Sequence, residues 1–190
     1  PYVVAEADES DGSFLLLQPV VAVITNIDRD NMDHYEGSFK RLRDAFLEFL
    51  HHLPFYGLAV LNLDDPELAS LIPEVGRPVL TYGFSPAADV RAENIRQQGL
   101  CMHFDLILPD QSVHQASIRL PGQHNVQNAL GAAAVAWELG IPASEIVAGL
   151  AEIVGIGRRF AAVGELTVSS GRVDVFEDYG HHPTELEATI

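Results

Sequence analysis

Short apolar runs alternate with helix-like stretches through the first half of the chain. The runs at 2–5, 20–25, 58–63 and 78–82 have the length and near-continuous apolar character of strands buried on both faces of a parallel sheet. Over 37–52, apolar residues recur at intervals of three and four, which predicts an amphipathic helix. Strands that alternate with helices predict an α/β fold, a mainly parallel sheet flanked by helices, with ligands at the carboxyl ends of the strands.

The region 84–120 has a different pattern. A short helix that begins at Asp65-Pro66 precedes it, and turn-forming residues then separate several strand-like runs. We expect a small antiparallel meander attached to the main sheet, with strands at 90–95, 100–108 and 113–120.

Two helices and a hinge candidate follow the meander. The first helix covers 125–139, is rich in alanine and ends at Gly140, and the second covers 143–153. The glycine-containing segment 155–157 is the best hinge candidate. Beyond it, 160–176 reads as two strands around a Ser-Ser-Gly turn.

This hinge divides the chain into two expected domains, part of a central domain over 1–156 and the opening of a second α/β domain over 157–190. With 190 residues, of which 47% are hydrophobic, the chain is about the size of one domain or slightly more. Both ends fall inside predicted elements, so we expect a segment of a larger protein.

Charge and cysteine content narrow the functional classes. The 27 acidic and 11 basic side chains give a formal charge of -16, which opposes binding to DNA, RNA or an anionic membrane surface. No apolar run approaches the roughly 18 residues of a membrane helix, and the single Cys101 cannot form an intrachain disulfide. We therefore expect a cytoplasmic protein with no nucleic-acid or membrane partner.

Four carboxylates lie close together directly after the first apolar run. They are Glu6, Asp8, Glu9 and Asp11. Parallel sheets place their ligand sites after strands, and Mg2+ favours carboxylate oxygens, so Glu6 is the first candidate for a metal ligand. The alternative is a solvated loop whose carboxylates cap a following helix.

Polar residues also follow the second apolar run. Asn31 and His34 lie in the segment 25–35, which opens with Thr-Asn-Ile. An asparagine carbonyl oxygen is a suitable ligand for Mg2+, and His34 is a second candidate for the same role. The alternative is that both are ordinary loop residues.

The segment 122–128 contains a histidine and two asparagines at the start of a predicted helix. Asn125 can cap this helix, and Asn128 lies on the same face one turn further on. Capping alone would explain Asn125, so spacing does not by itself assign His124 and the two asparagines to a ligand.

Two further groups lie near the end of the chain. Arg158 and Arg159 form one of the few adjacent basic pairs, at the expected hinge, where the alternative is an ordinary exposed pair. Asp178, His181 and His182 follow a predicted strand and could form a metal site. A zinc site would need further ligands at suitable spacing, and none is evident.

Taken in order, these segments resemble the Mur ligase family, which forms amide bonds with ATP during peptidoglycan synthesis. The resemblance rests on 6–11, 25–27, 122–128, 155–160 and 178–185, and it covers essentially the whole chain. It implies the nucleotide-binding central domain of such a ligase and the opening of its C-terminal domain.

Within the family, 6–11 and 51–57 are most similar to the member that joins L-alanine to UDP-N-acetylmuramate. The implied ligands are therefore ATP, Mg2+, UDP-N-acetylmuramate and L-alanine. A sister ligase that attaches a tripeptide to the same sugar nucleotide is the nearest alternative. The alternatives of other classes are a metal-dependent hydrolase that uses Asp178, His181 and His182, and a non-catalytic nucleotide-binding module.

The resemblance also implies roles at the nucleotide. It places His124, Asn125 and Asn128 against the adenine of ATP. It implies that Arg159, with Arg158 as the second choice, reaches the phosphates when the two domains close.

The remaining implied roles concern the metal and the reacting groups. Glu6 is the expected Mg2+ ligand, and Asn31 stands where the family has a metal-binding histidine. Asp178 is expected to approach the nucleotide, and His181 the reacting carboxylate and phosphate.

One family feature has no counterpart in this sequence. The family holds the phosphates with a glycine-rich loop that ends in lysine and threonine or serine, whereas Lys40 is the only lysine here and lies in a predicted helix. We therefore expect the isolated chain to be inactive.

Overall fold

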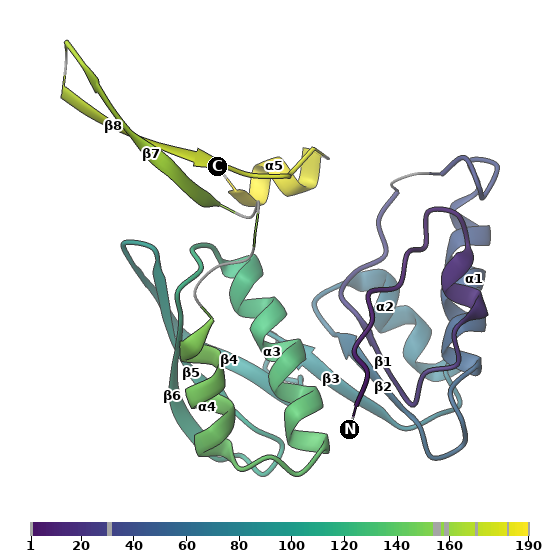
Figure 1. Ribbon diagram of the computed structural model, residues 1–190. Helices are drawn as coiled ribbons and strands as arrows, with labels where there is room; N and C mark the ends of the chain where they lie inside the picture. Colours follow the sequence, from purple (N-terminus) through teal and green to yellow (C-terminus); the bar gives the residue numbers. More distant parts are fainter. Residues whose placement is uncertain are drawn as a thin grey trace. The chain divides into compact units, whose positions relative to one another are not determined.

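The computed structural model describes residues 2–29, 32–153, 157, 160–169, 171–181 and 183–189 (Figure 1). Two compact units make up the chain, Pro1–Arg91 and Ala92–Ile190. The elements are, in order, η1 (Ser13–Leu16), β1 (Val21–Ile24), α1 (Phe39–His51), β2 (Leu58–Asn62), α2 (Pro66–Leu71), η2 (Ile72–Glu74), β3 (Val79–Gly83), β4 (Val90–Gln98), β5 (Cys101–Ile107), β6 (Val113–Ile118), α3 (Gln123–Glu138), α4 (Ala143–Glu152), β7 (Ala161–Val168), β8 (Gly171–Glu177) and α5 (Pro183–Thr189).

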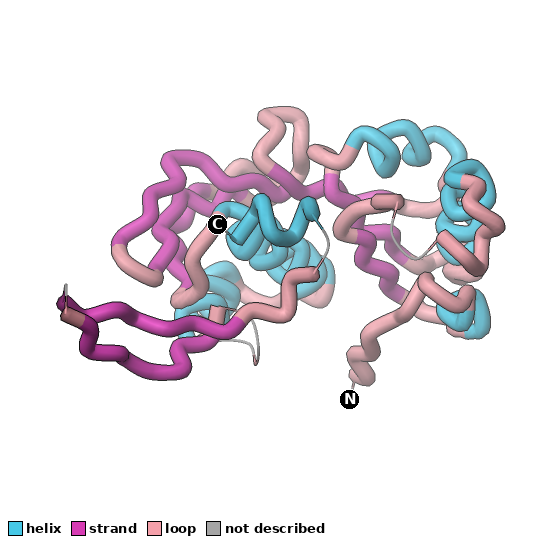
Figure 2. The backbone as a smooth tube through the Cα atoms, turned by 90° about the horizontal axis from the view of Figure 1, so that it is seen from above, coloured by secondary structure: helices cyan, strands magenta, loops and turns pink. Residues whose placement is uncertain are grey.

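Two sheets contain all of these strands. Strands β1 to β6 form one sheet in sequence order, and β7 pairs with β8 in the other, drawn as magenta segments in Figure 2. Strand β2 runs parallel to β1 and β3, β3 runs parallel to β4, and β5 is antiparallel to β6. Gly99, with φ +59°, lies in the two-residue connection from β4 to β5, a length that joins antiparallel strands. The expected α/β fold with a small antiparallel meander is confirmed.

Strand β2 occupies the interior of the sheet in the first unit, between β1 and β3. All five of its residues are buried, as the apolar run 58–63 predicted. The same prediction is wrong for β1, where Val23 is 43% exposed. Burial alternates along β1, with Ala22 and Ile24 buried and Val23 exposed, so only one face of this strand is well covered. Among the described residues, β2 is its one neighbour in the sheet.

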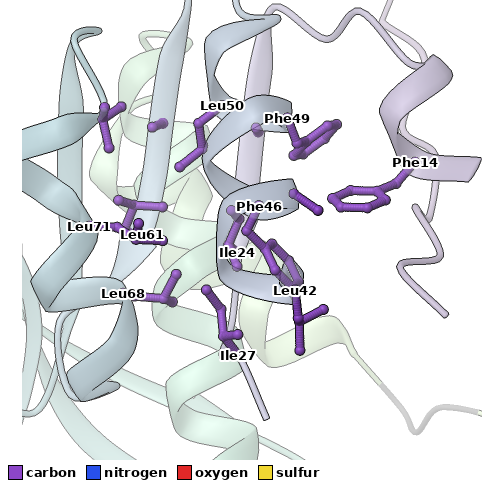
Figure 3. Packing of buried hydrophobic residues seen from close by; sticks show 14 of the residues in the cluster. Phe14, Ile24, Ile27, Leu42, Phe46, Phe49, Leu50, Leu61, Leu68 and Leu71 are labelled. Atoms are coloured by element: carbon purple, nitrogen blue, oxygen red, sulfur yellow. The ribbon is translucent and has the colours of Figure 1, made fainter. Parts of the chain in front are cut away.

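Helix α1 supplies much of the core of the first unit. Ser38 accepts a hydrogen bond from a backbone N–H of the first turn and so begins the helix. The buried side chains of Phe46, Phe49 and Leu50 lie on one face, as the spacing over 37–52 predicted (Figure 3). Phe14 from η1 packs against them, with ring centroids 5.3 Å from Phe46 and 5.1 Å from Phe49.

The expected strand at 2–5 is absent, and that prediction is wrong. The described residues of this run have no regular secondary structure, and the side chains of Val3 and Val4 are 95% and 96% exposed. An apolar run becomes a strand only when its backbone groups pair with a neighbouring strand, and within the described ranges β1 pairs with β2 alone. The apolar character of a run indicates that its side chains tend to be buried, but it does not show whether the backbone pairs with another strand.

Helices α3 and α4 belong to the second unit. Helix α3 begins at Gln123, two residues earlier than predicted, and ends before Gly140, whose φ of +74° suits a glycine after a helix. Helix α4 packs on β6 and on α3. Among the described residues, none of the helices combines the length and apolar character needed to cross a membrane.

Strands β7 and β8 form an antiparallel hairpin, as the segment 160–176 predicted. A register shift lies between Ala162 and Gly164. The predicted domain boundary adjoins residues 154–156, which lie outside the described part of the chain, so the division into 1–156 and 157–190 stays a prediction.

Candidate functional site

In the first unit, polar side chains meet at the carboxyl ends of β1, β2 and β3. Asn62, the last residue of β2, is only 5% exposed. Its Nδ2 donates to the carbonyl oxygen of Thr25 at 2.9 Å, and its Oδ1 accepts from the backbone N–H of Asp64 at 3.1 Å. This buried amide therefore joins the loop that follows β1 to the loop that follows β2.

Asp65 and Tyr82 hold the same loop. One oxygen of Asp65 accepts from the Leu68 N–H at 2.8 Å and begins α2, and the other accepts from the Ile27 N–H at 3.4 Å. The Tyr82 hydroxyl lies 3.5 Å from the Ile24 carbonyl oxygen. Burial raises the pKa of Tyr82 far above its usual range, so the hydroxyl stays protonated and donates. The backbone at 24–27 is thus held both from the start of α2 and from β3.

Sequence reasoning used Asp65 only as a helix start and missed Asn62 and Asp64. Asp64 accepts from the N–H groups of Phe84 at 2.6 Å and Ser85 at 2.9 Å, which fixes the turn after β3. The signal was present, because Asn62 interrupts the apolar run 58–63 and Asp64 directly follows that run. The same signal had identified 6–11 and 25–35.

The acidic segment 6–11 has two kinds of carboxylate. Asp8 accepts from the Ser10 N–H at 2.9 Å, and Asp11 accepts from the Ser13 N–H at 2.8 Å. The Ser13 hydrogen bonds lower the pKa of Asp11. These two side chains therefore stabilise the loop backbone locally, but the alternative that carboxylates of this segment cap a following helix is not confirmed, because the N-cap of η1 is Gly12 and no side chain caps it. Glu6 is exposed to solvent.

The second expected metal ligand, Asn31, lies outside the described residues. His34 is described and exposed, and its ring lies against Gly12. No group of three or more His, Cys, Asp or Glu side chains is placed to hold a metal ion within the described ranges. Protein-bound Mg2+ takes one or two carboxylates and completes its shell with water and substrate phosphates, so an exposed Glu6 fits such an ion.

In the second unit, the expected nucleotide residues lie at the start of α3. Gly122, with φ +93°, precedes the helix, and a Cβ there would lie 2.6 Å from the His124 ring. Asn125 is the third helical residue, and its Nδ2 donates to the Pro121 carbonyl oxygen at 2.7 Å. The prediction that Asn125 caps the helix is therefore wrong, because the helix begins before it.

Asn125 and Asn128 share one face of α3, as their spacing predicted. The two differ in burial, since Asn125 is 9% exposed whereas Asn128 is exposed. The first amide is therefore held by the protein, and the second faces solvent.

Replacing Asn125 with alanine should have two effects in the full-length protein. It removes the partner of the Pro121 carbonyl, so we expect a stability loss of about 1–2 kcal/mol. It should also raise the KM for ATP if the amide contacts adenine. Thermal unfolding and steady-state kinetics measure both effects. Asn128→Ala is the control: it should raise the KM for ATP and change the free energy of unfolding by less than about 0.5 kcal/mol. If Asn125→Ala lowers stability and leaves the KM for ATP unchanged, the Asn125 amide does not contact adenine.

Asp178 joins the two ends of the β7–β8 hairpin. Its two oxygens accept from the N–H groups of Phe160 at 2.8 Å and Gly180 at 2.7 Å. The rings of Phe160 and Phe176 stack with centroids 4.5 Å apart. His181 is exposed. Asp178 therefore holds the residue that directly follows the arginine pair.

Arg158 and Arg159 themselves lie outside the described residues. Their roles, and those of Asp178 and His181 toward a nucleotide, stay predictions. The structure brings together Asp178 and the backbone of Phe160.

A comparison with protein families identifies the larger part of this chain. The model of the Mur ligase middle domain matches residues 2–136. The chain belongs to the Mur ligase family. The match contains both the acidic segment 6–11 and the start of α3.

Individual Mur ligases match over almost the whole chain. The UDP-N-acetylmuramate--L-alanine ligase of Dichelobacter nodosus (strain VCS1703A) is 54% identical over 190 residues, which are 100% of this chain and 40% of that protein. The crystal structure of MurC, a UDP-N-acetylmuramate-alanine ligase from Thermotoga maritima, is 25% identical with a TM-score of 0.77, covering 95% of this chain and 39% of its own. MurF from Acinetobacter baumannii is 26% identical with a TM-score of 0.77, covering 96% and 39%.

Proposed function

We propose that this chain forms the nucleotide-binding part of a ligase that joins L-alanine to UDP-N-acetylmuramate with ATP, in peptidoglycan synthesis. The observation that carries the proposal is the 54% identity, over all 190 residues, to a ligase of that name. Fold similarity alone does not choose among Mur ligases, since MurC and MurF have equal TM-scores against this chain. The chain spans about 40% of the curated relatives that it matches, so the remaining parts would supply the other substrate sites.

The start of α3 would bind the adenine of ATP. An asparagine amide offers the donor and acceptor that match the N7 and 6-amino groups of adenine. Asn128 is exposed on the same helix face as Asn125, and the His124 ring lies directly over Gly122.

Glu6 and Asn31 would hold Mg2+, which neutralises phosphate charge when bound. Arg159, supported by Arg158, would bring a guanidinium group to the phosphates, and His181 would lie near the reacting carboxylate. The γ-phosphoryl group would pass to the lactyl carboxylate of UDP-N-acetylmuramate with release of ADP. The alanine amine would then attack the acyl phosphate, release phosphate and lose a proton as the amide forms.

The test is an assay of the full-length protein with UDP-N-acetylmuramate, ATP and Mg2+. L-alanine should support phosphate release and an amide product identified by mass spectrometry, whereas a tripeptide should not. Turnover with the tripeptide instead would favour the sister ligase. Phosphate release that is equally fast without any amine would favour a hydrolase.

Replacing Asn31 with histidine in the full-length protein should preserve turnover and shift the metal preference toward Mn2+ or Co2+. Imidazole suits these ions better than an amide oxygen does. Turnover measured as a function of each metal concentration tests this. His34→Asn is the matched control and should leave the preference unchanged; if it alone changes the preference, His34 is the ligand.

We also propose a cytoplasmic location. A ligase of this kind uses nucleotide substrates, and the acidic charge of -16 gives no attraction to an anionic membrane surface.

A further inference from the structure

Two exposed aromatic side chains stand at the amino end of the sheet in the first unit. Phe55 and Tyr56 lie just before β2, are 85% and 65% exposed, and have ring centroids 5.2 Å apart in an edge-to-face arrangement. Val20 directly precedes β1 and is 53% exposed. Its carbonyl oxygen accepts from the Leu58 N–H at 3.0 Å, which places it beside the start of β2. Val20, Phe55 and Tyr56 therefore form one apolar surface, the amino-end patch.

The loop that carries the two rings is anchored in the fold. The Gly57 N–H donates to the Pro54 carbonyl oxygen at 2.8 Å and closes the turn between α1 and β2. The Leu53 side chain, 1% exposed, lies in the core, and Arg77 Nε donates to the Leu53 carbonyl oxygen at 2.8 Å. A partner would therefore meet rings on an already ordered loop, which lowers the entropy lost on association.

The two segments that contain the patch carry no charged side chains, in a chain whose formal charge is -16. Residues 12–27 and 49–63 include no Asp, Glu, Lys or Arg. Two copies of the chain repel each other through their net charge, but these segments would bring no like charges together. The long-range repulsion is screened beyond about 8 Å at physiological salt. An apolar, uncharged surface is therefore the kind of partner that the patch fits.

The patch lies at the opposite end of the strands from the polar site of the first unit. That site is built at the carboxyl ends of β1, β2 and β3, and the five residues of β2 separate the two ends by roughly 16 Å. Under the proposed function, the other substrates react at the phosphates of ATP, so the parts of the ligase that carry them must reach the carboxyl ends. The patch lies away from that reaction and stays available to a second copy of the protein, which carries the same uncharged apolar surface.

We propose that the amino-end patch is the contact surface of a homodimer, in which Phe55 and Tyr56 of one copy pack against the same residues of the other around a two-fold axis. The choice of a second copy rests on the proposed function, which places the other substrate sites at the carboxyl ends. A buried aromatic side chain contributes about 150–250 Å². Two per copy bury less than the roughly 800 Å² per partner of a stable interface, so the dimer is reversible and forms at micromolar or higher protein concentration.

Sedimentation velocity of the full-length protein over a concentration series tests this proposal. The dimer fraction should rise with protein concentration. The dissociation constant should fall as salt is added, because salt screens the repulsion between two acidic copies and leaves the apolar contact in place. Phe55→Ala should raise the dissociation constant about tenfold or more, as truncation of a central aromatic residue does.

Two valine variants form a matched pair for the same experiment. Val20→Ala removes apolar atoms from the patch and should raise the dissociation constant in the same direction as Phe55→Ala, by a smaller factor. Val113→Ala removes the same atoms from a side chain in β6 that is 62% exposed, and it should leave the dissociation constant unchanged.

A full-length protein that stays monomeric at every concentration and salt overturns the proposal. Thiol labelling of Phe55→Cys, read by peptide mass spectrometry, then gives the reason: slow labelling means that another part of the same chain covers the patch, and fast labelling means that nothing does. A dimer that Phe55→Ala does not weaken uses another surface and also overturns the proposal. Failure of the ligase assay with L-alanine is a separate result, because it rejects the proposed function whether or not Phe55→Ala weakens a dimer.

Discussion

Replacing Arg159 with alanine in the full-length protein is expected to lower kcat by about 100-fold or more, because under the proposed function it would remove a charge partner of the phosphoryl group in the transition state. The melting temperature should barely change if the role of Arg159 is to contact phosphate, since surface ion pairs typically contribute about 1 kcal/mol or less to folding. Asp178 supports this expectation, because its carboxylate holds the backbone N–H of Phe160, the residue directly after Arg159. Steady-state kinetics and thermal unfolding of the same preparation measure the two quantities.

Arg172→Ala is the matched control for this experiment. Arg172 lies in the same hairpin, is 77% exposed and pairs with Glu165 at 3.3 Å. Its removal should leave both kcat and melting temperature nearly unchanged. Normal turnover with lowered stability in the Arg159 variant would show that Arg159 packs the domains together and does not act on phosphate.

A second large effect is expected in the core of the first unit. Leu61 is 0% exposed in β2, so Leu61→Ala should lower the free energy of unfolding by about 3–4 kcal/mol through lost burial and the cavity left behind. For a chain of this size, such a loss corresponds to a melting temperature lower by roughly 10 °C. Urea and thermal unfolding of the 190-residue chain, followed by circular dichroism, measure the change.

Leu16→Ala removes the same atoms from a side chain that is 85% exposed. It should change the free energy of unfolding by less than about 0.5 kcal/mol. Equal losses in the two leucine variants would contradict the assignment of β2 to the interior of the core.

The helices and strands that the sequence predicted correctly are those in which the spacing of apolar residues shows which side chains are buried. The spacing of Phe46, Phe49 and Leu50 is set by the helical repeat, so α1 was predicted to within a residue or two. The apolar residues 58–61 of β2 indicate cover on both faces, and all five residues of the strand, Asn62 included, are buried. The helix after 122 was also predicted, but its start was displaced by two residues because Asn125 looks like a cap.

Strand pairing and contacts between distant residues could not be predicted from the spacing of apolar residues. Val3 and Val4 are as apolar as the residues of β1, and no local property shows that they lack a strand partner. The bond from Tyr35 to Glu9 joins residues 26 positions apart, and the bond from Asn62 to Thr25 joins residues 37 apart. Each depends on how separate elements pack. The family resemblance added the expected roles of Glu6 and Arg159, which spacing alone could not assign.

The position of β2 has a consequence for hydrogen exchange. Its backbone is paired with β1 on one edge and β3 on the other, and both faces are covered. Amide protons in such a strand exchange with solvent mainly when the whole unit opens, whereas those of loops exchange through local fluctuations. Asn62 is the last residue of this strand and holds the Thr25 loop by its side chain. The loop that leads to Asn31 starts at the end of β1, and at Thr25 it is held by a side chain of the strand that we expect to exchange most slowly in this unit.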